Sequence, residues 1–453
     1  MKRIILILAL LVGHGFSWAQ SSDKLNLTIY NQDLALIREF RNLDFKKGVF
    51  EIKFKDVASR IDPTSVHFKV PKFPDQVTIL EQNYQFDLVS SEKILEKYID
   101  KTIQLVTKQD KDYKGELLSY DGGGLTLKES NGAIRIISRA EVRDIFFPAL
   151  PEGLITRPTL LWQLDSDISG KQDAEVSYLT SGINWHTEYV AVIDKEDKNL
   201  ELAGWVSIDN RSGATFLNAK LKLIAGDIHR VRDELRRSYA MDGIAMASKE
   251  AAQFEEKAFF EYHLYTLTRP ATVKDKEIKQ ITLFPNTSVK VQKIFAFDGA
   301  WYDKKIRVNL EFLNSQKDGL GIPLPKGKIR VYKEDVDKSQ EFVGEDLIDH
   351  TPKDEKVRIY VGNAFDIVGE RIQTDFKRIS DDVDRYSYQI TLRNHKEQKV
   401  EVVVIEHLSY GGEWEIISSN YDYVKKDAFT IEFKIPLEKN SEKKLNYTVQ
   451  YVR

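Results

Sequence analysis

Short runs of β-branched and aromatic residues recur along almost the whole chain, and glycine, proline, asparagine or aspartate separates them. Several runs alternate apolar and polar residues with a period of two, the pattern of a strand with one buried face. A short helix is expected only at 90–99, which opens with two serines, and within an insertion described below. The pattern predicts a mainly β protein of antiparallel β-sandwich domains rather than alternating βαβ units.

Hydrophobic cores alone must stabilise these strands. The chain has 453 residues and no cysteine, which excludes disulfides and thiolate metal sites. At about 100–200 residues per domain, this length predicts roughly three domains.

The N-terminus has the pattern of a secretory signal peptide. Lys2 and Arg3 precede an apolar run, and Ser17-Trp18-Ala19 supplies small residues before a cut at Gln20. We therefore expect a chain secreted across the inner membrane, located in the periplasm, at the cell surface or outside the cell. No later run approaches the roughly 20 apolar residues of a spanning helix, so no transmembrane segment is expected after signal removal.

The charge balance does not favour a nucleic-acid partner. The net charge is -3, and removal of Lys2 and Arg3 with the signal peptide changes it by two, to -5. Nucleic-acid binding depends on a clear excess of basic residues, which this chain lacks.

Breaks in the pattern divide the chain into segments. Between 102 and 147, five short runs are joined by Asp121-Gly122-Gly123-Gly124 and Asn131-Gly132 turns, which predicts a small SH3-like or Sm-like barrel. The expected units are a signal peptide (1–19), an N-terminal β domain (20–88), a short helix with the small barrel (89–150), the first part of a β-sandwich region (151–229), a helical or mobile insertion (230–260) and the C-terminal part of the sandwich region (261–453).

Part of the chain resembles a known family. The segment VSYLTSGINWHTEYVAVIDKEDKNLELAGWVSIDNRSGATFLNAKLKLIAGDI, followed by LPKGKIRVYKED and ITLRNHKEQKVEVVVIEHL, is similar to the domain of unknown function 4139 of mucoidy-inhibitor-like proteins. The N-terminal IYNQDLALIREFRNLDFKKGVF resembles the N-terminal module of such proteins. The resemblance implies an envelope association, and the family has no established catalytic residues to carry over to this chain. Longer members carry a coiled coil where this chain has the small barrel, so an oligomer built by that coil is not implied.

One stretch, SGINWHTEYV at 181–190, concentrates chemically versatile side chains. In a strand, Trp185 and Tyr189 share one face, while His186 and Glu188 share the other. One interpretation is a strand whose aromatic residues anchor a core, and the other is a binding or metal site. No HExxH or His-x-His pair occurs, so a metal site has little support.

Three further features are weaker candidates. DSDISGKQDAEV mimics a calcium loop through Asp165, Asp167, Ser169 and Asp173, but its twelfth position is Val176 instead of glutamate. A polar cluster around His350 precedes a strand, and a solvated turn around Pro352 is the preferred interpretation of it. Trp414 lies beside Gly411-Gly412 and would suit a sugar or a protein partner if it is exposed.

These observations lead to one preferred hypothesis and two alternatives. The first is a secreted, non-catalytic interaction or scaffold protein of the cell envelope, without cofactors, whose partner is an envelope protein or a polysaccharide. A link to capsule or exopolysaccharide comes only from the resemblance. The alternatives are a secreted hydrolase acting on glycan or peptide, and a carbohydrate-binding protein. The sequence does not specify an oligomeric state.

Overall fold

The computed structural model describes residues 24–151, 153–226, 228, 254–259, 262–408 and 412–452. The expected signal peptide and most of the expected insertion lie outside these ranges. Five sheets and one short α-helix make up the described chain, which confirms the mainly β fold. Within these ranges, no helix has the length and apolar character needed to cross a membrane.

An eight-stranded sheet combines the N-terminal strands with strands far along the chain. Its order is β16-β17-β15-β1-β2-β12-β4, with β18 paired to β15. β1 is parallel to β15, and the other pairs are antiparallel. The strands are β1 (Leu25–Tyr30), β2 (Leu34–Phe45), β4 (His67–Lys69), β12 (Gly170–Thr180), β15 (Phe216–Ala225), β16 (Phe254–Phe259), β17 (Tyr262–Leu267) and β18 (Ala271–Val273).

A three-stranded antiparallel sheet, in the order β3-β11-β5, packs on the eight-stranded sheet. Trp162 of the smaller sheet and Phe68 of the larger one have ring centroids 4.8 Å apart. The strands are β3 (Gly48–Lys55), β5 (Val77–Gln85) and β11 (Thr159–Ser166). The segments 20–88 and 151–229, which we expected as separate units, therefore contribute strands to the same two sheets.

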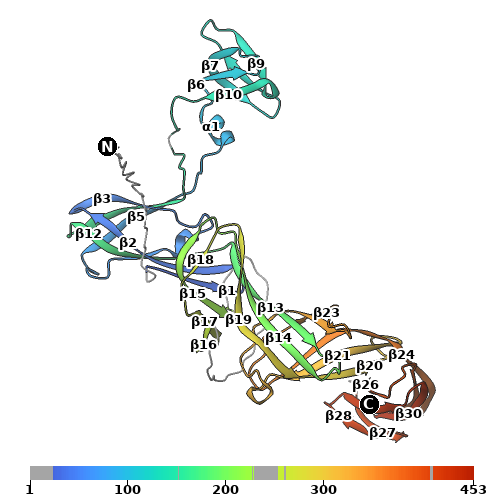
Figure 1. Ribbon diagram of the computed structural model, residues 1–453. Helices are drawn as coiled ribbons and strands as arrows, with labels where there is room; N and C mark the ends of the chain where they lie inside the picture. Colours follow the sequence, from blue (N-terminus) through green and yellow to red (C-terminus); the bar gives the residue numbers. More distant parts are fainter. Residues whose placement is uncertain are drawn as a thin grey trace, which may run out of the picture.

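The small unit at 89–150 lies away from the rest of the molecule, connected to it by two chain segments (Figure 1). Helix α1 (Ser91–Lys97) begins after Ser90, whose side chain accepts a hydrogen bond from the Lys93 N–H, and it packs on the small sheet's own core. The sheet order is β10-β6-β7-β8-β9. Its strands are β6 (Thr102–Thr107), β7 (Asp112–Tyr120), β8 (Gly124–Lys128), β9 (Ile134–Ser138) and β10 (Val142–Phe146).

The expected strands of this unit are confirmed, while the described strand pairings do not close the small SH3-like or Sm-like barrel that the sequence predicts. The 3-10 helix η2 (Arg139–Glu141) leads the chain from β9 to β10, and β10 then pairs with β6 at the opposite edge of the sheet. β9 and β10 are thus the two edges in the described pairings, and the sheet stays open.

A five-stranded sheet forms the middle of the molecule, in the order β19-β14-β13-β22-β23. β13 and β22 are parallel, whereas the other neighbours are antiparallel. The strands are β13 (Ile183–Ile193), β14 (Asn199–Asn210), β19 (Glu277–Lys290), β22 (Gly327–Glu334) and β23 (Gln340–Ile348). This sheet shares one continuous core with the two N-terminal sheets.

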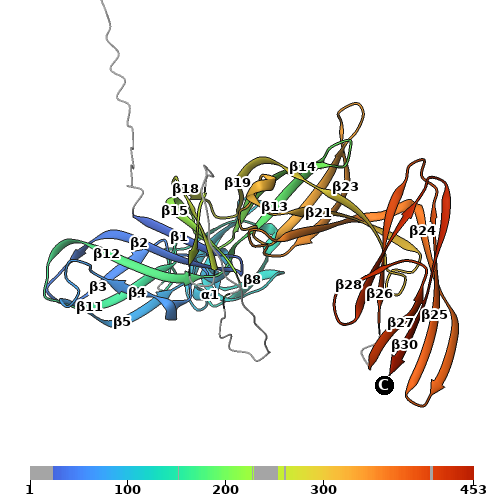
Figure 2. The same ribbon diagram turned by 90° about the horizontal axis from the view of Figure 1, so that it is seen from below.

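The C-terminal part is a nine-stranded sheet with its own core. Its order is β27-β30-β25-β24-β21-β20-β26-β29-β28, in which β20 and β26 are parallel. Figure 2 shows most of these strands, among them β25, β27 and β30, at one end of the elongated molecule. They are β20 (Gln292–Phe297), β21 (Lys305–Leu313), β24 (Lys356–Ser380), β25 (Val383–Asn394), β26 (Val400–His407), β27 (Glu413–Ser419), β28 (Tyr423–Lys425), β29 (Thr430–Leu437) and β30 (Ser441–Val452).

Two local expectations differ from the structure. The run TSVHFKV at 64–70 predicts one strand from its β-branched and aromatic residues. The strand is limited to β4, because Asp62 caps the 3-10 helix η1 (Pro63–Ser65) by accepting the Thr64 N–H. The expected insertion extends as far as residue 260, whereas Phe254–Phe259 form β16. This strand pairs with β17, and its Phe254 is buried. A third 3-10 helix, η3 (Gln316–Asp318), follows β21.

Candidate functional site

The aromatic residues of the 181–190 stretch form part of the core. Trp185 is buried, and its indole Nε1 donates a hydrogen bond to the Ile224 carbonyl oxygen at 3.1 Å. Tyr189 is also buried, and its hydroxyl donates to the Pro325 carbonyl oxygen at 2.7 Å. Both polar groups are satisfied within the protein, so these rings anchor the middle sheet and present no surface to a ligand.

The opposite face of β13 carries the histidine and the acid. His186 Nε2 lies 3.4 Å from Glu188 Oε1, and the Arg330 guanidinium donates to Glu188 Oε2 at 2.8 Å. This hydrogen bond lowers the pKa of Glu188 in spite of partial burial, and His186 adds a smaller effect in the same direction. Glu188 is therefore held as an ionised partner of Arg330, which does not suit a general base near neutral pH.

His350 joins segments that are distant in sequence. Its Nδ1 accepts the Lys326 backbone N–H at 3.2 Å. Its Nε2 lies 3.3 Å from the Asn31 side-chain nitrogen, in the turn between β1 and β2. His350 thus contacts both the segment before β22 and the β1–β2 turn of the eight-stranded sheet.

The calcium-loop mimic is divided between two sheets. Asp165 lies in β11 of the three-stranded sheet, whereas Asp173 lies in β12 of the eight-stranded sheet, where it accepts a hydrogen bond from Asn42 at 3.1 Å. Asp167 and Ser169 are exposed on the crossing between the sheets. Within the described ranges, no three His, Cys, Asp or Glu side chains are grouped to hold a metal ion.

Trp414 is half-buried against the C-terminal core. Its Nε1 donates to the Ala428 carbonyl oxygen at 2.7 Å, and the Lys425 ammonium lies 4.7 Å from the ring centroid. The lysine covers part of the ring surface that a sugar would need.

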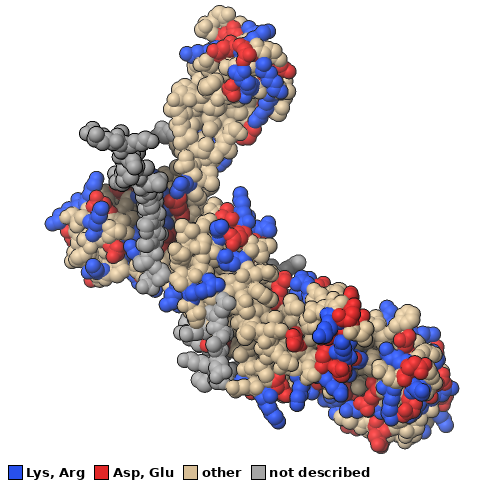
Figure 3. Space-filling model, in the orientation of Figure 1, with Lys and Arg blue, Asp and Glu red and all other residues tan. Residues whose placement is uncertain are grey.

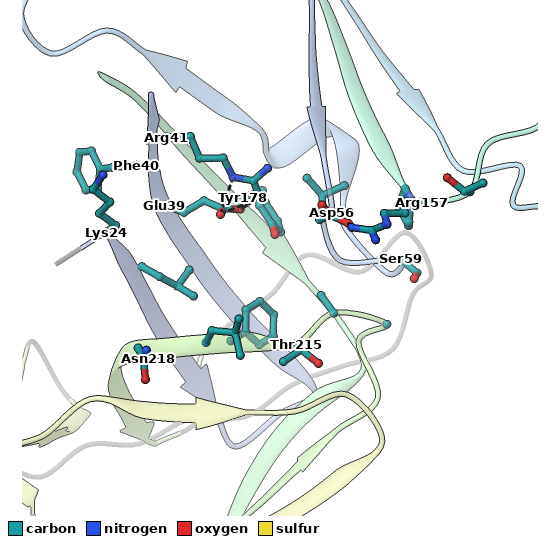
Figure 4. A pocket seen from close by; sticks show the side chains of 18 of the residues that line it. Lys24, Glu39, Phe40, Arg41, Asp56, Ser59, Arg157, Tyr178, Thr215 and Asn218 are labelled. Carbon is teal, nitrogen blue, oxygen red and sulfur yellow. Dashed lines mark hydrogen bonds and ion pairs between the residues drawn. The ribbon is translucent and has the colours of Figure 1, made fainter. Parts of the chain in front are cut away.

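A cavity of about 700 Å³ lies where the small unit joins the rest of the molecule (Figure 4). β1, β2 and the segment that leads into β15 form its walls, together with Leu88 and residues 156–158 from the two connections to the small unit. The cavity is within the range of about 300–1,000 Å³ that is usual for ligand sites. Its apolar lining consists mainly of Leu25, Phe40, Val57, Leu88, Phe216 and Leu217.

The principal charged pair of this cavity is Glu39 with Arg41. The Arg41 Nη2 lies 2.9 and 3.0 Å from the two carboxylate oxygens, and its guanidinium carbon lies 3.7 Å from the Phe54 ring centroid. Burial raises the pKa of the Glu39 carboxyl, while Arg41 acts in the opposite direction. Because both carboxylate oxygens accept from Arg41, Glu39 is engaged in the wall of the cavity.

Three further ionisable groups of the cavity, those of Arg157, Asp56 and Tyr178, are also engaged or protonated. Arg157 Nη1 lies 2.8 Å from Asp56 Oδ1 at the rim. Burial raises the pKa of Tyr178, so its phenol stays protonated at neutral pH. The arrangement offers apolar surface, fixed ion pairs and a hydroxyl, a lining suited to binding a ligand.

Sequence reasoning identified none of these cavity residues as functional. They come from separate segments of the chain, and one of their ion pairs, Arg157–Asp56, joins positions distant in sequence. The one sequence signal of this cavity was the stretch EFRNLDF at 39–45, in which charged residues stand between aromatic ones. It belongs to the segment that resembles the N-terminal module of the family.

Comparison with known proteins adds no family. Neither a scan against protein-family models nor a search of curated proteins finds a match for this chain. The resemblance to domain of unknown function 4139 stays a prediction from the sequence.

Proposed function

We propose that this protein is a non-catalytic interaction or scaffold protein of the cell envelope, and that the cavity beside Arg41 receives a segment of its partner. The observation that carries the proposal is the position of the cavity. Leu88 and residues 156–158 line it at the base of both connections to the small unit, so an occupant would contact the body and the small unit's attachment together.

The lining of the cavity suits a protein segment. At its rim, Leu217 has 56% of its surface exposed, and the Asp56–Arg157 pair is accessible nearby. Apolar anchors within a polar rim are typical of protein recognition sites. A partner side chain could cover Leu217 while its backbone exchanges hydrogen bonds with the rim.

The small unit offers a second contact surface. On the edge strand β9, Ile134 and Ile136 are 66% and 76% exposed. An edge strand has unpaired backbone groups along one side and can add a strand from another chain. Two exposed isoleucines beside such an edge support a protein partner.

The envelope location and the link to capsule or exopolysaccharide rest on the sequence, through the signal-peptide pattern and the family resemblance. Figure 3 shows basic and acidic side chains intermixed over the visible face, without a broad patch of one sign. This distribution favours a protein or glycan partner over nucleic acid.

The hydrolase alternative receives no support from this cavity. Glycosidic hydrolysis needs one carboxyl as a proton donor and a second as a base or nucleophile. Glu39 and Asp56 each pair with an arginine instead.

The test is chemical crosslinking in intact cells of the source organism, followed by mass spectrometry of what the full mature chain captures. We expect the unaltered chain to capture one or two envelope proteins. The variant Leu217→Glu should no longer capture them. Val336→Glu is the matched control, because Val336 is 83% exposed and lies outside the cavity. Recovery of the free chain alone, or unchanged capture by Leu217→Glu, would contradict the proposal.

A further inference from the structure

A second cavity, of about 370 Å³, lies in the C-terminal part where the turn between β20 and β21 meets β24 and β26. This turn, at 298–304, carries Trp301 and Tyr302, and the Asp298 carbonyl oxygen accepts the backbone N–H of both residues. Gly299 lets the turn approach the sheet, because a Cβ there would lie only 2.7 Å from the Arg371 Cβ. Close packing thus fixes the two aromatic residues at the cavity.

The aromatic surface at this cavity is unusually accessible. Trp301 has 70% of its surface exposed, although its ring lies beside that of His407 with centroids 5.3 Å apart. Arg307 lies between two tyrosines, 4.6 Å from the Tyr302 ring centroid and 4.0 Å from that of Tyr360. These contacts order the rings and leave a broad face of the Trp301 indole open to a ligand.

A buried carboxylate oxygen at the cavity lacks a partner. Asp298 is 7% exposed, and its Oδ2 lies 2.8 Å from His407 Nε2. Its Oδ1 is buried without a hydrogen-bond partner among the described residues. A buried acceptor in this state is rare in folded proteins, and a ligand hydroxyl would satisfy it.

We propose that this cavity binds a pyranose unit of a glycan. The C–H face of the sugar ring would lie on Trp301, one hydroxyl would donate to Asp298 Oδ1, and the Arg307 guanidinium would donate to a ring substituent. The carboxylates of Asp298 and Asp346 are balanced by two guanidinium groups, those of Arg307 and Arg358, so the charge of the lining suits neutral and acidic pyranose units alike. The inference is independent of the partner segment proposed for the cavity beside Arg41, which lies in another part of the molecule.

The structure moves the expected sugar contact from Trp414 to Trp301. The sequence suggested Trp414, whose ring is partly covered by Lys425, whereas Trp301 is open and has an unpaired acceptor nearby. An exposed ring together with directed polar groups is the combination that a sugar requires, since its ring faces are apolar and its edges carry hydroxyls.

The test is affinity electrophoresis of the full mature chain in gels that contain dextran, laminarin, glucomannan or alginate, with a printed array of bacterial polysaccharides in parallel. We expect retardation by at least one of these glycans and a loss of affinity of about tenfold with Trp301→Ala. Trp301→Tyr keeps an aromatic face and should retain most of the binding. Retardation by neutral glycans or by alginate supports the proposal equally and distinguishes neutral from acidic pyranose units.

The matched control is Trp205→Ala, because Trp205 is 38% exposed on β14 and does not line this cavity. It should bind as the unaltered chain does. Circular dichroism should show that Trp301→Ala remains folded, since its side chain lies mostly in solvent. Absence of binding to every gel and array glycan, or equal binding by Trp301→Ala and the unaltered chain, would overturn the proposal.

Discussion

Strand β13 and the turn between β20 and β21 contain similar residue types in opposite surroundings. β13 has Trp185 and Tyr189 in the core, with both polar groups hydrogen-bonded to backbone carbonyls. The turn has Trp301 and Tyr302 at the surface, beside a carboxylate oxygen without a partner. The comparison teaches that the same residue types serve the core where the fold satisfies their polar groups, as at Trp185 and Tyr189, and stay open to a ligand where the ring is exposed, as at Trp301.

The largest expected difference concerns stability. Trp185→Ala should lower the free energy of unfolding by about 3–5 kcal/mol, because it leaves a large cavity in the core. Trp301→Ala should change it by less than about 0.5 kcal/mol, because the side chain is mostly in water. Urea denaturation followed by near-ultraviolet circular dichroism measures both values. Similar losses for the two variants would contradict the comparison.

A smaller difference is expected when only a hydroxyl is removed. Tyr189→Phe should cost about 1–3 kcal/mol, because the buried Pro325 carbonyl loses its donor. Tyr302→Phe, its matched control, removes a hydroxyl that accepts from Arg307 at the surface and should cost less than about 0.5 kcal/mol. The same urea denaturation measures the free energy of unfolding of both variants. A larger loss of stability for Tyr302→Phe than for Tyr189→Phe would contradict the prediction.

The smallest effect concerns the pH dependence of Glu188. Its pKa is lowered in the folded state, chiefly by Arg330, so its stabilising contribution is present above the unfolded-state pKa of about 4.3. The contribution is lost as the pH falls through the lower, folded-state pKa. Glu188→Gln should therefore cost less than about 1 kcal/mol at pH 7 and progressively less in acid.

Denaturation of this variant across acidic and neutral pH checks the prediction. Arg330→Gln serves as the control, because it removes the same ion pair from the other side and should abolish the same pH dependence. A cost for Glu188→Gln that does not change with pH would show that the ion pair with Arg330 is not its cause.

The sequence predicted strands well where alternation was clear. The alternation through β13 placed Trp185 and Tyr189 on one face and His186 and Glu188 on the other, as the structure shows. β2 was not predicted as a strand, because arginine and aspartate interrupt its apolar pattern. Its position between β1 and β12 depends on pairing with a strand from another part of the chain, which local pattern cannot specify.

Both cavities were beyond sequence reasoning for the same physical reason. The cavity beside Arg41 combines β2 with segments before β11 and β15, and the cavity beside Trp301 combines a turn with β24 and β26. Only folding brings these segments together. A Trp-Tyr pair in a glycine-containing turn, at 298–304, was the one local signal of the second cavity.

The central claim is that partners contact the cavity at the base of the small unit and do not contact β13. Site-specific photo-crosslinking in intact cells tests this claim, with the photoreactive residue at position 217 in one chain and at position 186 in another. Both native side chains are accessible, since Leu217 is 56% exposed and the His186 side chain is 50% exposed. We predict a discrete crosslinked envelope protein from position 217 and none from position 186. A discrete partner at position 186, with none at position 217, would contradict the account.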